Sequence, residues 1–203
     1  MHPQTWGWFF AFDAALCFAP GPAMLYVLAA GLRDGRGAAF AANLGIVGGN
    51  ALYVALLAGG LGHWLLATAG ASLLLRLLGA AYLVALGLSI YRGAPGRPAP
   101  NRAPRRTAWR RFVTGIGVQM ANPKTFVLYT ALVPRFLDAA RALMPQLAVL
   151  CATTLAVQFG ALLVYGEIAA RFGARTLRPG WRRGLQRAAG GLLMTAGLVT
   201  AAA

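Results

Sequence analysis

The chain carries two long apolar segments that are each broken by proline, at matching places in its two halves. The first covers residues 6–30 and contains Pro20-Gly21-Pro22, and the second covers residues 112–133 and contains Asn122-Pro123-Lys124. Proline lacks a backbone donor and clashes with the preceding turn, so each tripeptide should break its helix. Backbone groups freed inside a bilayer are tolerated only beside protein or a wet cavity. Paired breaks of this kind predict the binding site of a membrane transporter.

Composition places the chain in a membrane. It is 59% hydrophobic and 11% charged, with a mean hydropathy of +0.62, which is not typical of a soluble domain. Its apolar stretches each approach the roughly 20 residues that a spanning helix needs, at about 6–30, 38–61, 72–91, 112–133, 146–169 and 184–203. We therefore predict an all-α integral membrane protein with six transmembrane helices. A single polytopic domain should cover residues 1–203, and the first stretch is a poor signal peptide because no basic residue precedes it.

Arginine is distributed unevenly between the loops. Fifteen arginines fall in or beside the first, third and fifth loops, and only Arg76, Arg135 and Arg141 fall on the other side. Basic residues in short loops stay cytoplasmic, so we predict a cytoplasmic loop 92–111 and two periplasmic or extracellular termini. The formal net charge of +15 then reflects topology and contact with membrane lipid. A nucleic-acid partner would instead favour aromatic residues among the basic ones, so we expect none.

Loop 92–111 also separates two halves, residues 1–91 and 112–203. It is rich in proline and glycine, as a helix-breaking linker should be. Three predicted helices lie on each side of it. Because three is odd, a duplicated half inserts upside down relative to its partner, which predicts two inverted three-helix repeats with proline-broken helices 1 and 4.

Several polar residues lie near the centre of their predicted helices, counting 1.5 Å per residue. Lys124 is the only lysine of the chain, and an ionised lysine at this depth costs roughly 2.5–3.5 kcal/mol. A structural alternative is a lysine that snorkels or binds carbonyl groups freed by the neighbouring proline. The predicted substrate-binding or transport residues are Pro20, Gly21, Pro22, Asn50, Asn122, Pro123, Lys124 and Gln158.

The chain has few carboxylates. Asp34 and Asp138 lie beside arginines and are interpreted as solvated neighbours, and Glu167 precedes an arginine by four residues, the spacing of a helical ion pair. Asp13 lies roughly 10 Å inside the first helix. An intramembrane acid is a functional candidate by default. Pairing of Asp13 with a backbone donor or with Arg141 is the structural alternative.

These residues resemble the LysE/RhtB family of amino-acid translocators, the lysine-exporter and homoserine/threonine-resistance proteins. The stretches 18–25, 31–40 and 45–50 (FAPGPAML, GLRDGRGAAF and GIVGGN) are similar to the first signature of that family. Residues 78–87 with Arg92 resemble its third helix, and residues 111–115, 121–124 and 133–136 resemble its fourth. Many family members carry an aspartate where this chain has Asn50, so the resemblance does not carry a proton-coupling role to that position.

The resemblance implies export of amino acids or close derivatives across the bacterial inner membrane, driven by the proton-motive force. Asp13 and Glu167 are then the candidates for proton coupling. Helix N-termini created by the two breaks attract a carboxylate, and Lys124 adds a full charge. Gly45 and Gly49 should let the second helix pack closely against a neighbour. Rocking of one half against the other would alternate access to the site. A homodimer is a candidate assembly.

Two other classes of protein share single features with this chain. A membrane thiol–disulfide conduit could use Cys17, which lies near Pro20, together with Cys151, but the chain has no C-x-x-C motif and two structural thiols are favoured. A membrane enzyme is disfavoured because only two histidines are present and no His/Asp/Glu cluster has metal-ligand spacing. We therefore expect no enzyme activity, no metal and no cofactor.

Overall fold

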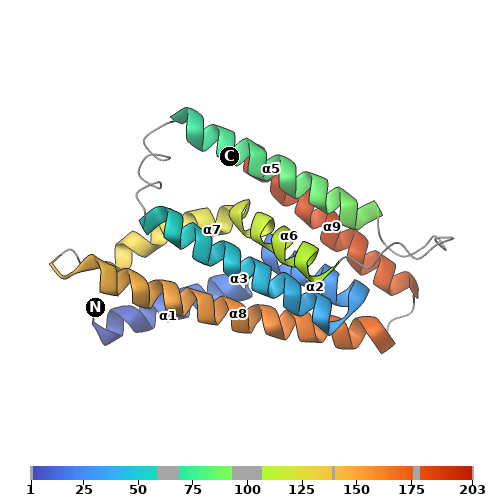
Figure 1. Ribbon diagram of the computed structural model, residues 1–203, viewed down its shortest axis with the longest axis horizontal. Helices are drawn as coiled ribbons and strands as arrows, with labels where there is room; N and C mark the ends of the chain where they lie inside the picture. Colours follow the sequence, from blue (N-terminus) through green and yellow to red (C-terminus); the bar gives the residue numbers. More distant parts are fainter. Residues whose placement is uncertain (1, 59–68, 93–106, 139, 176–178, 203) are drawn as a thin grey trace.

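The computed structural model describes residues 2–58, 69–92, 107–138, 140–175 and 179–202, and these residues form helices and no strand. The elements are α1 (Pro3–Phe18), α2 (Pro22–Asp34), α3 (Arg36–Ala58), α5 (Ala69–Arg92), α6 (Ala108–Met120), α7 (Pro123–Val127), the π-helical turn η1 (Leu128–Leu132), the 3₁₀ turn η2 (Val133–Phe136), α8 (Leu143–Arg175) and α9 (Pro179–Ala202) (Figure 1). The prediction of an all-α chain is confirmed for this part of the molecule.

The helices coincide with the predicted apolar stretches, but several of their limits differ. The fifth predicted stretch, 146–169, lies inside the much longer α8, and the sixth begins five residues later than α9 does. The second predicted stretch, 38–61, corresponds to α3, which is described up to Ala58. Residues 59–61 of that stretch lie outside the described residues. A run of apolar residues marks only the part of a helix that is buried in lipid or in the protein core. Polar and basic residues at the ends of the helix continue the same backbone hydrogen bonds, so the helix is longer than the apolar run.

Both predicted breaks are confirmed. The axes of α1 and α2 differ by 49° across Ala19–Gly21, and Pro22 occupies the first turn of α2, where its missing N–H costs nothing. The hydroxyl of Tyr165 in α8 donates to the carbonyl oxygen of Phe18 at 2.7 Å, which satisfies one group left open at the end of α1. The second break separates α6 from α7, after which the backbone continues as the irregular turns η1 and η2.

Within the described residues, two helices are long and apolar enough to cross a membrane, over Arg36–Leu56 and Leu143–Phe172. The bent pair α1–α2 makes a third span when it is counted as one broken helix. The part of α5 from Leu77 to Arg92 is apolar but shorter than these spans. The fourth predicted span is divided by its break into short pieces.

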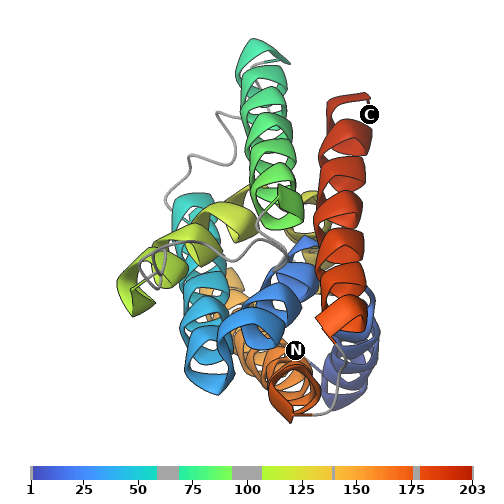
Figure 2. The same cartoon turned by 90° about the vertical axis from the view of Figure 1, so that its right-hand side faces the viewer.

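Small residues bring the helices together. A Cβ atom built on Gly45 of α3 would lie 2.1 Å from the carbonyl oxygen of Phe112 in α6, and one on Gly49 would lie 2.8 Å from the Cβ of Gln119. The close packing predicted for these two glycines is therefore confirmed. Gly87 of α5 and Gly190 of α9 meet reciprocally, since a Cβ on either would lie 2.6 Å from the other's carbonyl oxygen. Figure 2 shows α5 and α9 side by side.

Basic residues gather at one end of the molecule. Figure 1 shows the α2–α3 turn, the start of α6, the end of α8 and the start of α9 at this end, which we call the arginine end, while the N-terminus and the start of α5 lie toward the opposite end. The described arginines of the first, third and fifth loops and their flanks are Arg33, Arg36, Arg92, Arg110, Arg111, Arg171, Arg175, Arg182, Arg183 and Arg187. The helices thus run from one end to the other in alternation.

Candidate functional site

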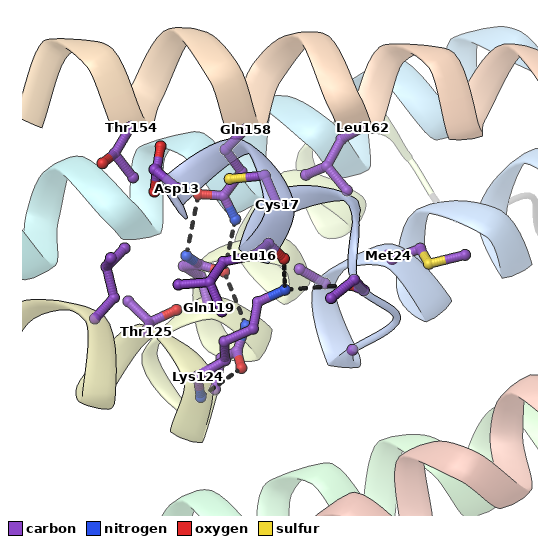
Figure 3. Close-up of a pocket in the computed structure, with 15 residues that line it drawn as sticks. Asp13, Leu16, Cys17, Met24, Gln119, Lys124, Thr125, Thr154, Gln158 and Leu162 are labelled. Carbon is purple, nitrogen blue, oxygen red and sulfur yellow. Dashed lines mark hydrogen bonds between the residues drawn. The ribbon is translucent and has the colours of Figure 1, made fainter. Parts of the chain in front are cut away.

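A partly enclosed cavity, which we call the central cavity, lies where the two helix breaks meet. It has a volume of about 20 Å³ and is lined by residues of α1, α2, α6, α7, η1 and α8. That volume is enough for about one water molecule. Figure 3 shows its polar side chains converging from both halves of the chain. The predicted residues that line it are Asp13, Gly21, Asn122, Lys124 and Gln158.

Lys124 crosses the cavity to the broken end of α1. Its ammonium group donates to the carbonyl oxygen of Leu16 and, at 3.2 Å, to that of Ala19 (Figure 3). The last carbonyl groups of a helix have no partner within the helix and carry the negative end of its dipole. The half-buried ammonium is therefore held by groups that the first break exposes, and not by groups freed by Pro123 as the structural alternative assumed.

The N-terminus of α2 faces the same cavity. Its N-cap residue, Gly21, has no side chain to cap the helix, and Ala23 and Met24 of the first turn line the cavity. A Cβ atom at Gly21 would lie 3.8 Å from the Lys124 Nζ atom. One helix end with a positive dipole and one ammonium group thus point at one small volume.

The second break does not offer the same open amides. The side-chain oxygen of Asn122 accepts a hydrogen bond from the backbone N–H of Lys124 at 3.1 Å, so α7 caps its own N-terminus. This N–H group is therefore already hydrogen-bonded and is not open to a substrate carboxylate in this conformation. Asn122 is instead part of the cavity wall and 2% exposed.

Four buried amide side chains form a connected network across the molecule. Asn50 of α3 donates to the Gln158 oxygen of α8 at 2.9 Å, and Gln158 and Gln119 of α6 contact each other at 3.4 Å. Gln119 in turn accepts from Asn122 at 3.5 Å. The three predicted amides are thus brought together, whereas Gln119, which is 1% exposed, was missed. Its position three residues before Asn122 in an apolar helix was the available signal.

Asp13 lines the central cavity with its side chain completely buried. The hydroxyl of Thr154, itself 1% exposed, lies within interaction distance of the carboxylate (Figure 3). Neither carboxylate oxygen nor the Thr154 oxygen has a hydrogen bond of good geometry within the described part of the chain. The alternative partner, Arg141, contacts Asp138 at 3.2 Å and the His2 ring instead. The pairing of Asp13 with Arg141 is therefore excluded in this conformation.

The other carboxylates serve in ion pairs. Glu167 lies at the arginine end and contacts Arg171 at 2.5 Å, which confirms the helical pair, and it also contacts Arg36 of α3 at 2.6 Å. It does not line the central cavity. Asp34 contacts Arg111 of α6 at 2.7 Å, so its interpretation as a solvated neighbour is wrong. The fold brings this pair together across 77 residues of sequence.

The two cysteines are free and lie in different surroundings. Cys17 lines the central cavity one turn from Asp13, whereas Cys151 is buried in an apolar cluster with Phe9, Tyr53 and Leu150. Both positions are compatible with structural thiols.

Apolar helices that enclose a polar cavity at two helix breaks define a class, the membrane transporters. The sequence model of the LysE type translocator family matches residues 14–202. The chain therefore belongs to the LysE type translocators and is a multi-pass membrane protein and not an enzyme. The resemblance noted in its proline motifs is confirmed.

Curated relatives extend over the whole chain. The homoserine/homoserine lactone efflux protein of Salmonella typhimurium (strain LT2) is 29% identical over 203 residues, which is 98% of each chain, and that of Salmonella typhi matches equally well. An uncharacterized membrane protein of Vibrio cholerae is 27% identical and covers 100% of this chain. No solved structure matches the chain. The family and these relatives support an amino-acid efflux transporter at a general level.

Proposed function

We propose that this protein is a secondary active exporter of amino acids or close derivatives in the bacterial inner membrane. The observation that carries the proposal is the meeting of the Lys124 ammonium and the open N-terminus of α2 at the central cavity. Both attract a carboxylate. The relatives named for homoserine and homoserine lactone efflux support amino acids and close derivatives as the class of substrate.

Binding requires the cavity to widen. About 20 Å³ accommodates a water molecule and not an amino acid. In the proposed step, the substrate carboxylate binds the Lys124 ammonium and draws it away from the carbonyl oxygens of Leu16 and Ala19. Those two oxygens then accept hydrogen bonds from the substrate ammonium, helped by the amide oxygens of Asn50 and Gln158. In the contracted cavity, the Lys124 ammonium therefore occupies the position that the substrate ammonium takes after binding.

Asp13 is the proposed proton-coupling residue. A fully buried carboxylate without a well-formed hydrogen bond is costly when ionised, and it gains when it takes up a proton or meets a cation. It lies on α1 just before the carbonyl groups that hold Lys124, so its charge is felt at the binding site. Glu167 is the weaker candidate because it is already engaged by two arginines away from this cavity.

Alternating access through two inverted repeats is proposed for the transport step. The helix contacts support it, because they keep their pattern when the two halves are exchanged. The second helix of the first half, α3, packs on α6 of the second half, and α8, the second helix of the other half, packs on α1 and α2. The third helices, α5 and α9, pack on each other. In the proposed membrane orientation, the arginine end is cytoplasmic and both termini are periplasmic.

The test is uptake into inside-out vesicles from cells that produce the protein. A labelled panel of amino acids, with homoserine first, should accumulate in these vesicles when an acidic-inside proton gradient is imposed. Dissipation of the gradient with a protonophore should abolish accumulation. No accumulation of any amino acid above that of vesicles lacking the protein would contradict the proposal.

A further inference from the structure

A second polar cavity lies at the arginine end, between α2, α5, α6 and α9. We call it the arginine-end cavity. Its volume is about 50 Å³, compared with about 20 Å³ for the central cavity. Figure 2 views the molecule from this end, with α2 in the middle of the picture and α9 and α6 on either side. Two of the four helices belong to each half, so the cavity lies between the parts that would move during transport.

The cavity wall carries both signs of charge. The carboxylate of Asp34 lies 2.7 Å from Arg111 Nη2 and 3.9 Å from Arg33 Nε. Among the described residues that line the cavity, two positive groups stand against one negative group. A carboxylate is therefore attracted to this cavity, while Asp34 keeps a place for a cation beside it.

Gln186 of α9 gives the second observation. Its side chain is 2% exposed and lines the cavity, and its oxygen atom has no hydrogen-bond partner among the described residues. A buried carbonyl oxygen without a donor is costly, so the site favours a ligand that brings one. The hydroxyl-bearing residue Ser89 of α5 lines the same wall.

The two cavities lie along one stripe of α2. Ala23 and Met24 line the central cavity, and Ala30 and Arg33 line the arginine-end cavity. The ten positions between Ala23 and Arg33 correspond to roughly 15 Å along a helix. Tyr26 lies between them, is 4% exposed, and donates its hydroxyl to the Arg111 carbonyl oxygen at 3.0 Å. Tyr26 lines the arginine-end cavity and is not among the described residues that line the central cavity.

We propose that the arginine-end cavity is a first binding site for the zwitterionic head group of an amino acid, occupied before the substrate reaches Lys124. The carboxylate contacts Arg33 and Arg111, and the ammonium group donates to Asp34 and Gln186. This inference rests on the proposed export function. Movement of the Tyr26 hydroxyl away from Arg111 then joins the two cavities.

The test isolates this site by removing the charge of the other one. Labelled L-homoserine is bound to purified full-length protein that carries Lys124→Gln, and binding is measured by equilibrium dialysis in detergent. The Lys124→Gln protein should still bind the label. Adding Arg33→Ala or Gln186→Leu should weaken this binding roughly tenfold, the loss of one charge-assisted hydrogen bond. Adding Arg187→Ala, which removes a neighbouring arginine over the Tyr91 ring outside the cavity, should leave it unchanged.

Gln186→Glu keeps an oxygen acceptor at the same place and should retain binding even if Gln186→Leu destabilises the helix pair.

A lipid with an ethanolamine head group has the same pair of charges, so binding is repeated with added short-chain phosphatidylethanolamine. Displacement of the lipid by L-homoserine supports an amino-acid site. A lipid that L-homoserine never displaces would overturn it.

The outcomes separate this inference from the proposed function. If Arg33→Ala and Gln186→Leu leave the binding unaltered, the arginine-end site is overturned even when the wild-type protein exports amino acids. If vesicles export none, but binding persists and depends on Arg33 and Gln186, the export function fails and the binding site is supported.

Discussion

The ammonium group of Lys124 lies 3.2 Å from the carbonyl oxygen of Ala19, so the charge of the second break is held by the open helix end of the first. Each break supplies what the other lacks. The end of α1 presents the carbonyl oxygens of Leu16 and Ala19, of which the first also accepts from the backbone N–H of Ala19. The start of α7 brings a cation that binds both oxygens. A ligand that binds this cation must therefore disturb both breaks, which couples occupancy of the site to movement between the halves.

Lys124→Gln is expected to abolish transport while the protein still inserts and folds, because it removes a half-buried charge and keeps a hydrogen-bond donor. Lys124→Arg is expected to be impaired as well, since a planar guanidinium does not fit a site built for an ammonium group. Uptake of labelled substrate into vesicles measures both. The comparison that isolates the carboxylate uses amidated substrate: the wild type should discriminate strongly against it, and the glutamine variant much less. Equal discrimination by both proteins would show that Lys124 does not contact the carboxylate.

Asp13→Asn is expected to abolish accumulation driven by a pH gradient but to leave exchange of substrate across the membrane intact. The carboxamide keeps the size of the side chain and removes its ability to take up a proton. Both activities are measured in the same vesicles, the second with unlabelled substrate inside and labelled substrate outside. Thr154→Val, which removes the facing hydroxyl, is expected to alter the pH dependence of accumulation without abolishing it. Wild-type accumulation by the asparagine variant would return Asp13 to a structural role.

Gly45→Ala is expected to destabilise the protein by about 1–3 kcal/mol, the usual cost of forcing extra atoms into a packed contact. The added Cβ would lie 2.1 Å from the Phe112 carbonyl oxygen, so α3 and α6 would have to separate. The midpoint of thermal unfolding in detergent measures the change. Gly37→Ala is the matched control in the same helix, because its Cβ would meet nothing within 4 Å. The control should be neutral or slightly stabilising.

Local chemistry explains which parts of this site were predictable. Proline breaks a helix wherever it stands in the interior, so the two breaks follow from the positions of Pro20, Pro22 and Pro123 alone. Depth along an apolar helix similarly singles out Asn50 and Gln158, which need buried partners, and the fold makes them partners of each other. The alternation of the helices between two ends also follows from the arrangement of the apolar stretches.

Contacts between distant elements were not predictable in the same way. Asp34 stands between Arg33 and Arg36 in sequence, yet its shorter contact is with Arg111 of α6, which only the packing of α2 on α6 brings near. The same holds for Lys124, whose partners belong to α1 and not to its own break. The position of a charged residue in an apolar helix predicts that it needs a partner. Which residue becomes the partner depends on which helices pack together.

A reporter that is active only in the cytoplasm should work when inserted in loop 92–111 and fail when fused after Ala203. Arginines of the loops at that end should hold them on the cytoplasmic side. Insertions after Pro95 and a C-terminal fusion make the pair, and a second reporter that is active only outside the cytoplasm should give the opposite result. Cytoplasmic activity at the C-terminus would overturn either the orientation or the number of spans.

The ion pair between Asp34 and Arg111 should stabilise the arginine end far more than an exposed pair does. The Arg111 side chain is only 11% exposed, so Asp34→Asn leaves a largely buried guanidinium without its carboxylate. We expect a loss of about 1–3 kcal/mol, because a neutral amide oxygen replaces the charged partner of a largely buried guanidinium. The exchange of both residues, Asp34→Arg with Arg111→Asp, should recover part of this loss.

The matched control is Asp138→Asn, because the side chains of the Asp138–Arg141 pair are 39% and 49% exposed and such pairs contribute about 0–1 kcal/mol. Thermal unfolding of Asp34→Arg, Arg111→Asp and the double variant gives the coupling between the two positions directly, and Asp34→Asn is compared with the control. Equal losses for Asp34→Asn and Asp138→Asn would show that the Asp34–Arg111 contact does not hold α2 against α6.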